Sequence, residues 1–330
     1  MHPVFVRKVV QAVKDGGGKP FVCDVDWDYA GAEQRGYSSE VLGCPVYPMA
    51  GIRDRYAYEH IYDFKNMHRW MVGGMIEDAT FLVNFSHIKG HPSCGFGGAM
   101  KNLALGCMGS ETRSAIHDTN HYDRYWFGQL CPDAETRQRI IQSCPHRALV
   151  EDRHHAGELH LHFEPCNQCG RCLQVAPLGS LKIDPANFWA FQEACAISVK
   201  IVLGTFEEKK SIHLGLATHM TPVCDCFGFT SLPILPDVGI FGSDDIVALD
   251  QAVLDVTGKK PLIEENLPTS MEVHTRIGHP FRWLHGPLKD PYKVLEYAEA
   301  LAVGTCRYEL VDVLPVEGID AQPMGYIPAS

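Results

Sequence analysis

The 330-residue sequence has few positive charges and no long hydrophobic run. Lys and Arg number 29 against 40 Asp and Glu, and the net charge of −11 argues against a surface that follows nucleic-acid phosphates. No segment approaches the roughly 18 consecutive apolar residues of a transmembrane helix, and residues 1–18 lack the apolar core of a signal peptide. We therefore expect a cytoplasmic protein that binds neither nucleic acid nor membrane.

A dinucleotide-binding fingerprint, internal repeats and low-complexity tracts are also absent from the sequence. No segment with a strand pattern is followed by Gly-x-Gly-x-x-Gly and an acidic residue about 20 positions later. A flavin or nicotinamide held by that motif is therefore not expected.

Cysteine, by contrast, is abundant, with 13 residues. In a reducing compartment, clustered cysteines are typical of metal ligands or redox groups rather than of disulfides. An odd number also cannot be fully paired within one chain. The cysteine content therefore predicts a metal centre.

Alternating helix and strand patterns predict an α/β domain, with a mixed or parallel sheet covered by helices. This domain is expected to consist of two sequence segments, residues 1–130 and 188–330. Residues 131–187 have short elements and the densest cysteines, and predict an inserted ferredoxin-like α+β subdomain with short strands near 149 and at 159–163. We predict helices at 5–14, 62–76, from 99 onward, at 188–199, up to residue 257 after an Asp244 cap and at 290–302, strands at 20–24 and 80–85, an apolar segment at 211–217, and a long loop at 25–52.

The strongest motif is a cysteine triplet, Cys166, Cys169 and Cys172. Three thiolates within seven residues can wrap an iron–sulfur cubane, and in two-cluster ferredoxins a fourth Cys before Pro serves the other cluster. Here that position is Ala176, whereas upstream Cys144 precedes a proline. Three further positions where the upstream motif would carry Cys are Ala134, Arg137 and Ile140. We therefore predict a single [4Fe–4S] cluster on Cys144, Cys166, Cys169 and Cys172.

Three alternatives for this motif remain open at this stage. The same cysteines could hold a structural zinc ion, although zinc usually takes two separated Cys pairs. The group could be a cluster with only a structural role. Cys131 could replace Cys144 as the fourth ligand, although its spacing fits less well.

A second candidate site lies in residues 86–102, a loop between a predicted strand and a predicted helix. The carboxyl end of a strand that leads into a helix N-terminus is a usual ligand site in α/β sheets. Lys89 and Lys101 would hold a small anionic ligand, and His87 or His91 would carry protons. The alternative is a tight turn with surface lysines.

Further cysteines could contribute a second metal ion or cluster to this site. The candidates are Cys94, Cys107, Cys224 and Cys226, of which the last two flank Asp225 and could converge on one metal in a loop. The alternative is a set of free buried cysteines. The remaining cysteines have no Cys or His partner at ligand spacing and are expected in the core: Cys23, Cys44, Cys195 and Cys306.

These motifs together resemble the bacterial and archaeal iron–sulfur proteins built on the domain of unknown function 362. The matching blocks are SHIKGH at 86–91, GFGGAMKN at 95–102, PVCDC at 222–226, PDVGI at 236–240 and DIVALDQA at 245–252. The resemblance implies a cluster and a fold more than a reaction. Members usually carry two complete cysteine motifs and begin with further residues, whereas this chain keeps one motif and starts close to the first predicted helix.

Three functions follow from these features. In the first, an iron–sulfur oxidoreductase of anaerobic metabolism passes electrons from the cluster to a redox site formed by loop 86–102 with Cys224 and Cys226. In the second, the protein is a non-catalytic electron carrier that docks a redox partner protein. In the third, it is a metal-dependent non-redox enzyme whose cluster is structural.

Overall fold

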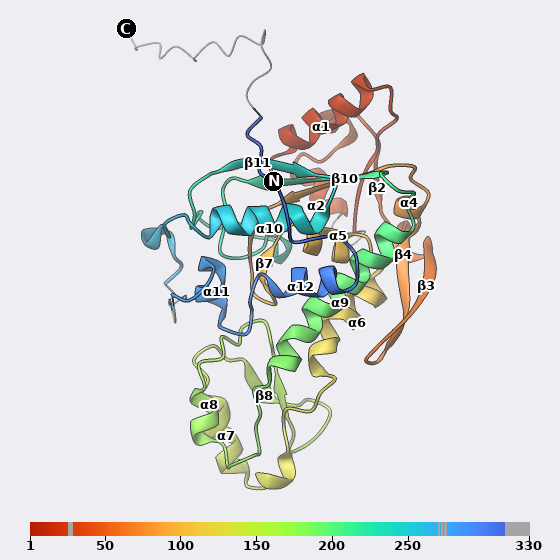
Figure 1. Cartoon of the computed structure of the whole chain (residues 1–330). Coiled ribbons are helices and arrows are strands. Elements are labelled where there is room, and N and C mark those ends of the chain that lie inside the picture. Colours follow the sequence, from red (N-terminus) through yellow and green to blue (C-terminus); the bar gives the residue numbers. More distant parts are fainter. Residues whose placement is uncertain (26–28, 270, 272, 274–275, 314–330) are drawn as a thin grey trace.

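The computed structural model describes residues 1–25, 29–269, 271, 273 and 276–313. They form a mixed α/β structure with parallel and antiparallel strand pairs covered by helices, which confirms the predicted fold class (Figure 1). The helices are α1 (Pro3–Asp15), α2 (Tyr29–Gln34), α3 (Ser39–Leu42), α4 (Gly74–Glu77), α5 (Ala99–Gly106), α6 (Ser110–Asp118), α7 (Ala134–Gln142), α8 (Arg171–Val175), α9 (Pro185–Gly204), α10 (Ile246–Thr257), α11 (Pro280–His285) and α12 (Lys293–Ala300). The strands are β1 (Val22–Asp24), β2 (Val46–Pro48), β3 (Ala57–Phe64), β4 (Met67–Gly73), β5 (Leu82–His87), β6 (Lys89–His91), β7 (Gly95–Gly97), β8 (Leu149–Glu151), β9 (Leu159–Leu161), β10 (Ser211–Ala217) and β11 (Gly239–Ser243).

The central sheet has the strand order β11-β10-β5. Strand β10 runs parallel to β5 and antiparallel to β11, with Leu216 opposite His87. Helices α5 and α10 pack against these strands. The carboxyl end of β5 leads directly into the β6–β7 hairpin, so that the candidate loop 86–102 begins at the edge where ligands bind in α/β sheets.

Helix α9 forms the centre of the main hydrophobic core. Its 20 residues are apolar on most sides, and residues such as Phe191 and Ala194 are fully buried. It contacts α5, α6 and α12, which explains why its sequence does not show a single apolar stripe.

The predicted helix at 62–76 was wrong. Strands β3 and β4 form an antiparallel hairpin there, joined by the two residues Lys65 and Asn66. Lys65 adopts a positive φ of 50°, as tight hairpin turns require. The fully buried Trp70 donates its indole N–H to the carbonyl of Tyr62 at 2.9 Å, and this bond links the two strands.

Three smaller predictions also need correction. The predicted loop at 25–52 contains α2, α3 and β2 among its described residues. Asp245, and not Asp244, caps α10 by accepting the N–H groups of the first helical turn. The glycine-rich segment 95–98 lies partly in β7, which pairs with β6.

A second hydrophobic core lies in the lower lobe of Figure 1, around α7, α8 and the β8–β9 hairpin. Its buried members come from residues 125–188 and include Leu149, Leu161 and Phe163. The predicted boundaries 131 and 187 fall close to the ends of this core. The assignment of the segment as a ferredoxin-like subdomain stays a prediction. Among the described residues, no helix has the length and apolar content to cross a membrane.

Candidate functional site

The four cysteines of the predicted cluster motif line one cavity in the second core. Cys144 follows α7, Cys166 and Cys169 lie in the loop before α8, and Cys172 lies in α8 itself. Cys131 is buried in the same core but does not line this cavity. The cavity therefore brings together the four residues that the sequence motif selected.

The loop around these cysteines is held in shape by its own polar groups. Gln168 and Gly170 have positive φ values of 57° and 76°, which turn the chain between the cysteines. The Asn167 amide lies 2.7 Å from His146 Nε2. The N–H of Ala148 donates to Cys144 Sγ at 3.3 Å, the kind of bond that orients and stabilises a metal-bound thiolate.

The electrostatics of the four thiols favour a cationic centre among them. Burial raises the pKa of Cys166. Burial, followed by the repulsion of Cys166, Cys144 and Cys169, raises the pKa of Cys172 to about 11. Four thiolates would repel one another at this spacing, and bound iron would relieve the repulsion, so this donor set fits an iron–sulfur cluster.

The spacing of these sulfurs fits a cluster better than a single zinc ion. Four thiolates on one zinc ion, each at about 2.3 Å, would lie about 4 Å apart. In the part of the chain that the structure describes, the only three His, Cys or carboxylate ligand atoms that lie mutually within 4.8 Å belong to His91, Cys224 and Cys226. No three of the four motif sulfurs meet that limit.

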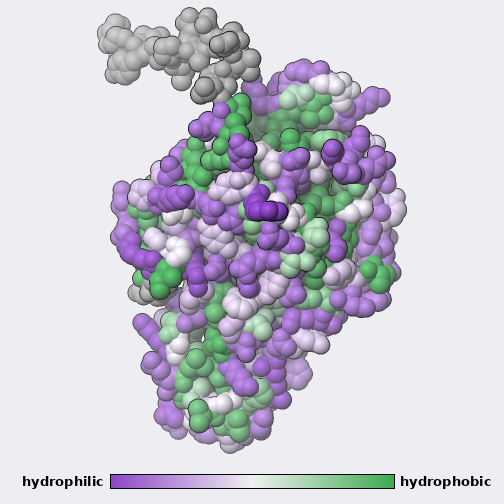
Figure 2. All heavy atoms as spheres, viewed as in Figure 1, coloured by the Kyte–Doolittle hydropathy of each residue, from purple (hydrophilic) through white to green (hydrophobic). Residues whose placement is uncertain are grey.

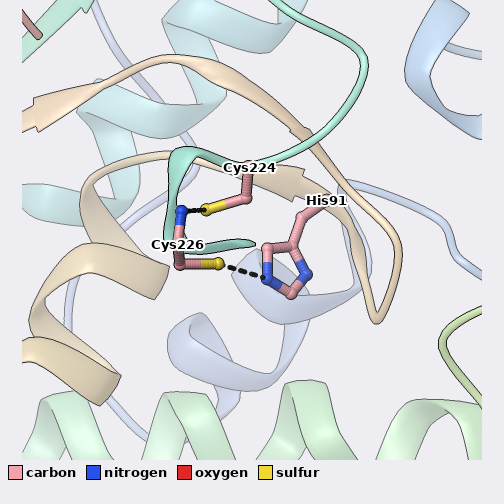
Figure 3. A group of neighbouring side chains, drawn as sticks. All are labelled: His91, Cys224 and Cys226. Carbon is pink, nitrogen blue, oxygen red and sulfur yellow. Dashed lines mark hydrogen bonds between the residues drawn. The ribbon is translucent and has the colours of Figure 1, made fainter. Parts of the chain in front are cut away.

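That second group, drawn in Figure 3, joins the β6–β7 hairpin to the segment after β10. His91 Nε2 lies 3.7 Å from Cys226 Sγ. Cys224 Sγ accepts the N–H of Cys226 at 3.4 Å. A Cβ at Gly90 would lie 2.2 Å from the carbonyl oxygen of Pro222, so glycine allows the two segments to approach. The group is compatible with metal binding.

Two lysines, the partly buried Lys101 and the buried Lys89, face these cysteines. Lys101, on α5, places Nζ 4.0 Å from Cys224 Sγ and 3.8 Å from Cys226 Sγ. Burial alone would lower the pKa of Lys101, but the neighbouring cysteine thiols, led by Cys224, raise it above its usual value. Lys89, on β6, is buried and adds a second positive charge near both sulfurs. The two lysines therefore favour negative charge on the sulfur pair.

The pKa values of the group agree with this charge arrangement. A hydrogen bond from the Cys226 thiol, helped by Lys101 and Lys89 and opposed by burial, lowers the pKa of Cys224. The same bond raises the pKa of Cys226. Burial, and then Lys101, lowers the pKa of His91 to about 4, so that this imidazole is neutral at pH 7.

The other predicted site residues lie at varying distances from this group. His87 contacts Asp225 Oδ2 through Nδ1 at 2.7 Å and the carbonyl of Thr218 through Nε2 at 2.9 Å, which fixes its ring. Cys94 Sγ lies 3.6 Å from His91 Nδ1 and donates to the carbonyl of Phe96. Cys107 is buried at the end of α5 beside Cys23 and Asp24, and does not join the group. Among the cysteines expected in the core, Cys44 and Cys195 are buried, whereas Cys23 and Cys306 are partly exposed.

The N-terminus of α5 was expected to bind an anionic ligand, but a carboxylate of the chain occupies it. Asp250 Oδ1 accepts the N–H of Ala99 and Oδ2 accepts that of Met100, each at 2.8 Å. Burial raises the pKa of Asp250 to about 7, although both hydrogen bonds oppose the rise. An outside anion at this site would therefore depend on Lys89 and Lys101 rather than on these two N–H groups.

Sequence reasoning missed Lys289, which lies between the two cysteine sites. Its side chain is buried, and Nζ donates to the carbonyl oxygen of Glu164 at 2.6 Å. Its charge acts on both Cys166 and Cys94. Burial lowers its pKa to about 8, although Cys166 and Glu164 oppose this effect. No motif surrounds this lysine, so only the packing of the chain reveals it.

Comparison with known families gives one match. The sequence model of a family described as a domain of unknown function (DUF362) matches residues 1–255, which include both cysteine sites but not Lys289. Neither the curated proteins nor the solved structures contain a match to this chain.

Proposed function

Because the chain belongs to the DUF362 family, whose name assigns no reaction, we propose from its own residues that it is an iron–sulfur redox protein. One [4Fe–4S] cluster is held by Cys144, Cys166, Cys169 and Cys172 and exchanges electrons with the group around Cys224 and Cys226. The observation that carries this proposal is the single cavity lined by the four motif cysteines.

The residues around the cavity would hold and tune the cluster. When bound, a [4Fe–4S] cluster supplies one-electron storage at a potential set by hydrogen bonds, nearby charge and solvent exposure. The Ala148 N–H donates to Cys144, and the buried Lys289 provides positive charge near Cys166. Both features stabilise added negative charge at the centre.

A short series of contacts supports electron exchange between the two sites. His91 stacks on Phe191 with ring centroids 6.3 Å apart, and Phe191 contacts His117 at 4.8 Å. His117 Nδ1 lies 3.7 Å from a carboxylate oxygen of Glu164, whose carbonyl accepts from Lys289. These contacts lead from the Cys224–Cys226 group to the cluster loop through buried and partly buried side chains.

Exposed apolar residues near the cluster loop support the docking of a redox partner protein. Leu173 and Val175 in α8 are partly exposed, and Leu178 is fully exposed. Figure 2 shows apolar residues gathered on the lower lobe of the molecule. Such residues are typical of a protein–protein contact rather than of a solvated surface.

The proposal is tested by the iron and sulfide content of protein purified without oxygen, with low-temperature electron paramagnetic resonance (EPR). We expect about four iron and four sulfide per chain, and one signal after reduction. About eight iron would place a second cluster at the Cys224–Cys226 group. Zinc without iron would contradict the proposal.

A metal-dependent non-redox enzyme is the second candidate function. The observation that favours it is the set of three ligand atoms from His91, Cys224 and Cys226. A Cys₂His set leaves a fourth zinc position open, as catalytic zinc sites require. One zinc per chain in addition to about four iron, lost in a Cys226→Ser variant, would support this alternative.

Replacing Lys289 with methionine is expected to lower the reduction potential of the cluster by on the order of 60 mV, a tenfold change in a one-electron equilibrium. The reason is that a buried positive charge near Cys166 stabilises the reduced form, which carries one more negative charge. The potential is measured by an EPR-monitored redox titration. Lys200→Met, on an exposed position of α9, is the control and should leave the potential nearly unchanged. Equal shifts in the two variants would rule out a local role for Lys289.

A further inference from the structure

We propose that Cys224 and Cys226 form a redox-active dithiol that closes to an intramolecular disulfide by exchange with a low-molecular-weight disulfide. This inference rests on the proposed function, because it specifies the redox chemistry of the Cys224–Cys226 group with which the cluster would exchange electrons. It also adds a two-electron thiol couple to the one-electron centre in the second core.

The first argument is that several hydrogen-bond donors converge on the two sulfurs. The Cys226 N–H donates to Cys224 Sγ, and the Lys101 ammonium lies within 4.0 Å of both sulfurs. His91 Nδ1 accepts the N–H of Ser93 at 3.1 Å, so the neutral ring carries its proton on Nε2. That nitrogen points at Cys226 Sγ in Figure 3. Converging donors stabilise thiolates, the form in which cysteine reacts.

The same geometry is less suited to a metal ion. A histidine that binds metal through one nitrogen usually donates a proton from the other, but His91 accepts at Nδ1 from a backbone N–H. The buried Lys89 and the partly buried Lys101 would also repel a cation placed between the sulfurs. The group therefore fits a reactive thiol pair better than a metal centre.

The backbone allows the two sulfurs to bond. They are separated by one residue, lie within 4.8 Å of each other and flank the start of a 3-10 turn at Asp225–Phe227. Gly228, with a φ of 79°, ends this turn. Rotation of the two side chains would close the remaining distance to the roughly 2 Å of a disulfide bond.

Exposure assigns a different role to each cysteine. Cys226 is exposed and is the sulfur that an outside disulfide can reach, whereas Cys224 is only 3% exposed.

The thiol–disulfide exchange needs no oxidant other than the outside disulfide. The two cysteines share one proton in their hydrogen bond, and its transfer from Cys226 to Cys224 leaves a thiolate at the exposed Cys226. This thiolate attacks one sulfur of the outside disulfide, forms a mixed disulfide and releases the first outside thiolate, which takes the proton from Cys224. The Cys224 thiolate then attacks Cys226 Sγ, forms the Cys224–Cys226 bond and releases the second outside thiolate, which water protonates. The protein pair loses two electrons and one proton, and the outside disulfide gains the two electrons.

The Cys224–Cys226 disulfide can be assayed in a single tryptic peptide. Trypsin cleavage after Lys210 and Lys259 releases residues 211–259, in which Cys224 and Cys226 are the only cysteines. We would incubate the cluster-containing protein with oxidised and reduced glutathione at fixed ratios without oxygen. The protein is then alkylated under denaturing conditions and digested with trypsin, and the mass of peptide 211–259 is measured by mass spectrometry.

The expected product is a peptide that has lost two hydrogens and carries no alkyl group, in a fraction that follows a two-electron equilibrium with the glutathione ratio. Cys224→Ser should trap glutathione on Cys226. Lys101→Met should slow disulfide formation at least tenfold, whereas Lys200→Met should not change its rate.

Two results would overturn the dithiol. One is full alkylation of both cysteines at every glutathione ratio. The other is a metal ion bound to the native protein, lost in Cys226→Ser, that prevents disulfide formation at every glutathione ratio. Iron, sulfide and the EPR signal are measured on the same sample, so that each proposal can be rejected without the other. An intact cluster beside unreactive thiols would contradict only the dithiol proposal. An oxidisable dithiol in protein without a cluster would contradict only the proposed cluster.

Discussion

An Asp250→Ala variant is expected to lose about 3 kcal/mol of unfolding free energy where Asp250 is protonated in the wild type, because two buried N–H groups lose their acceptors at about 1.5 kcal/mol each. Asp250 reaches from α10 to the N-terminus of α5 and accepts the N–H groups of Ala99 and Met100. Gly98 makes room for it, since a Cβ there would lie 2.5 Å from Asp250 Oδ1. The loss is measured by urea unfolding.

Two further variants test the cause of this loss. Asp250→Asn keeps one acceptor oxygen and should lose less stability than Asp250→Ala. Asp244→Ala, at an exposed position just before the same helix, should change stability by less than about 0.5 kcal/mol. An Asp250→Ala variant as stable as the wild type would show that the two helices do not depend on this carboxylate.

The pH dependence of stability gives an independent check on Asp250. Burial raises its pKa from 3.8 to about 7, so the folded protein holds a proton that the unfolded chain has released between about pH 4 and pH 7. The contribution of Asp250 to stability is therefore complete below about pH 4 and falls as the pH rises to about 7. The difference between wild type and Asp250→Ala should follow this window, and a difference that rises with pH would contradict the assigned pKa.

Elements with a plain local signal could be predicted from the sequence, whereas those decided by packing could not. Helix α1 (Pro3–Asp15) covers the predicted residues 5–14, because the helical periodicity there ends at three consecutive glycines. The β3–β4 hairpin was missed because its aromatic and apolar residues also occur at helical spacing. Its Lys65–Asn66 turn lacks the glycine that usually marks a two-residue hairpin loop.

The candidate site also has a part that the sequence could predict and a part that it could not. The Cys-x-Cys motif suggested that Cys224 and Cys226 could converge, and the structure places them together with His91. The grouping of Cys107 with them failed because α5 carries it to the opposite end of the helix from Lys101 and buries it beside Cys23. Contacts of this kind depend on the whole fold, and a single sequence gives no signal for them.

Replacing Cys144 with alanine is expected to abolish the EPR signal of the reduced four-iron cluster and to remove most of the bound iron. Cys144 lines the cavity with the cysteine triplet, and its sulfur already accepts a backbone N–H from Ala148. A cluster iron that loses its thiolate is exposed to solvent and is readily released. Iron content and the EPR signal are measured on protein purified without oxygen.

Cys131→Ala is the matched control, because Cys131 is the other cysteine that could have completed the motif. Cys131 is buried in the same hydrophobic core but does not line the cavity, and its carbonyl accepts a hydrogen bond from Arg137. The variant should therefore keep about four iron per chain and its EPR signal, with only the small loss of stability that follows from a core cavity. The reverse pattern, with iron lost in Cys131→Ala and kept in Cys144→Ala, would move the fourth ligand to Cys131. Loss of the cluster in neither variant would mean that three protein thiolates and an outside ligand suffice to hold it.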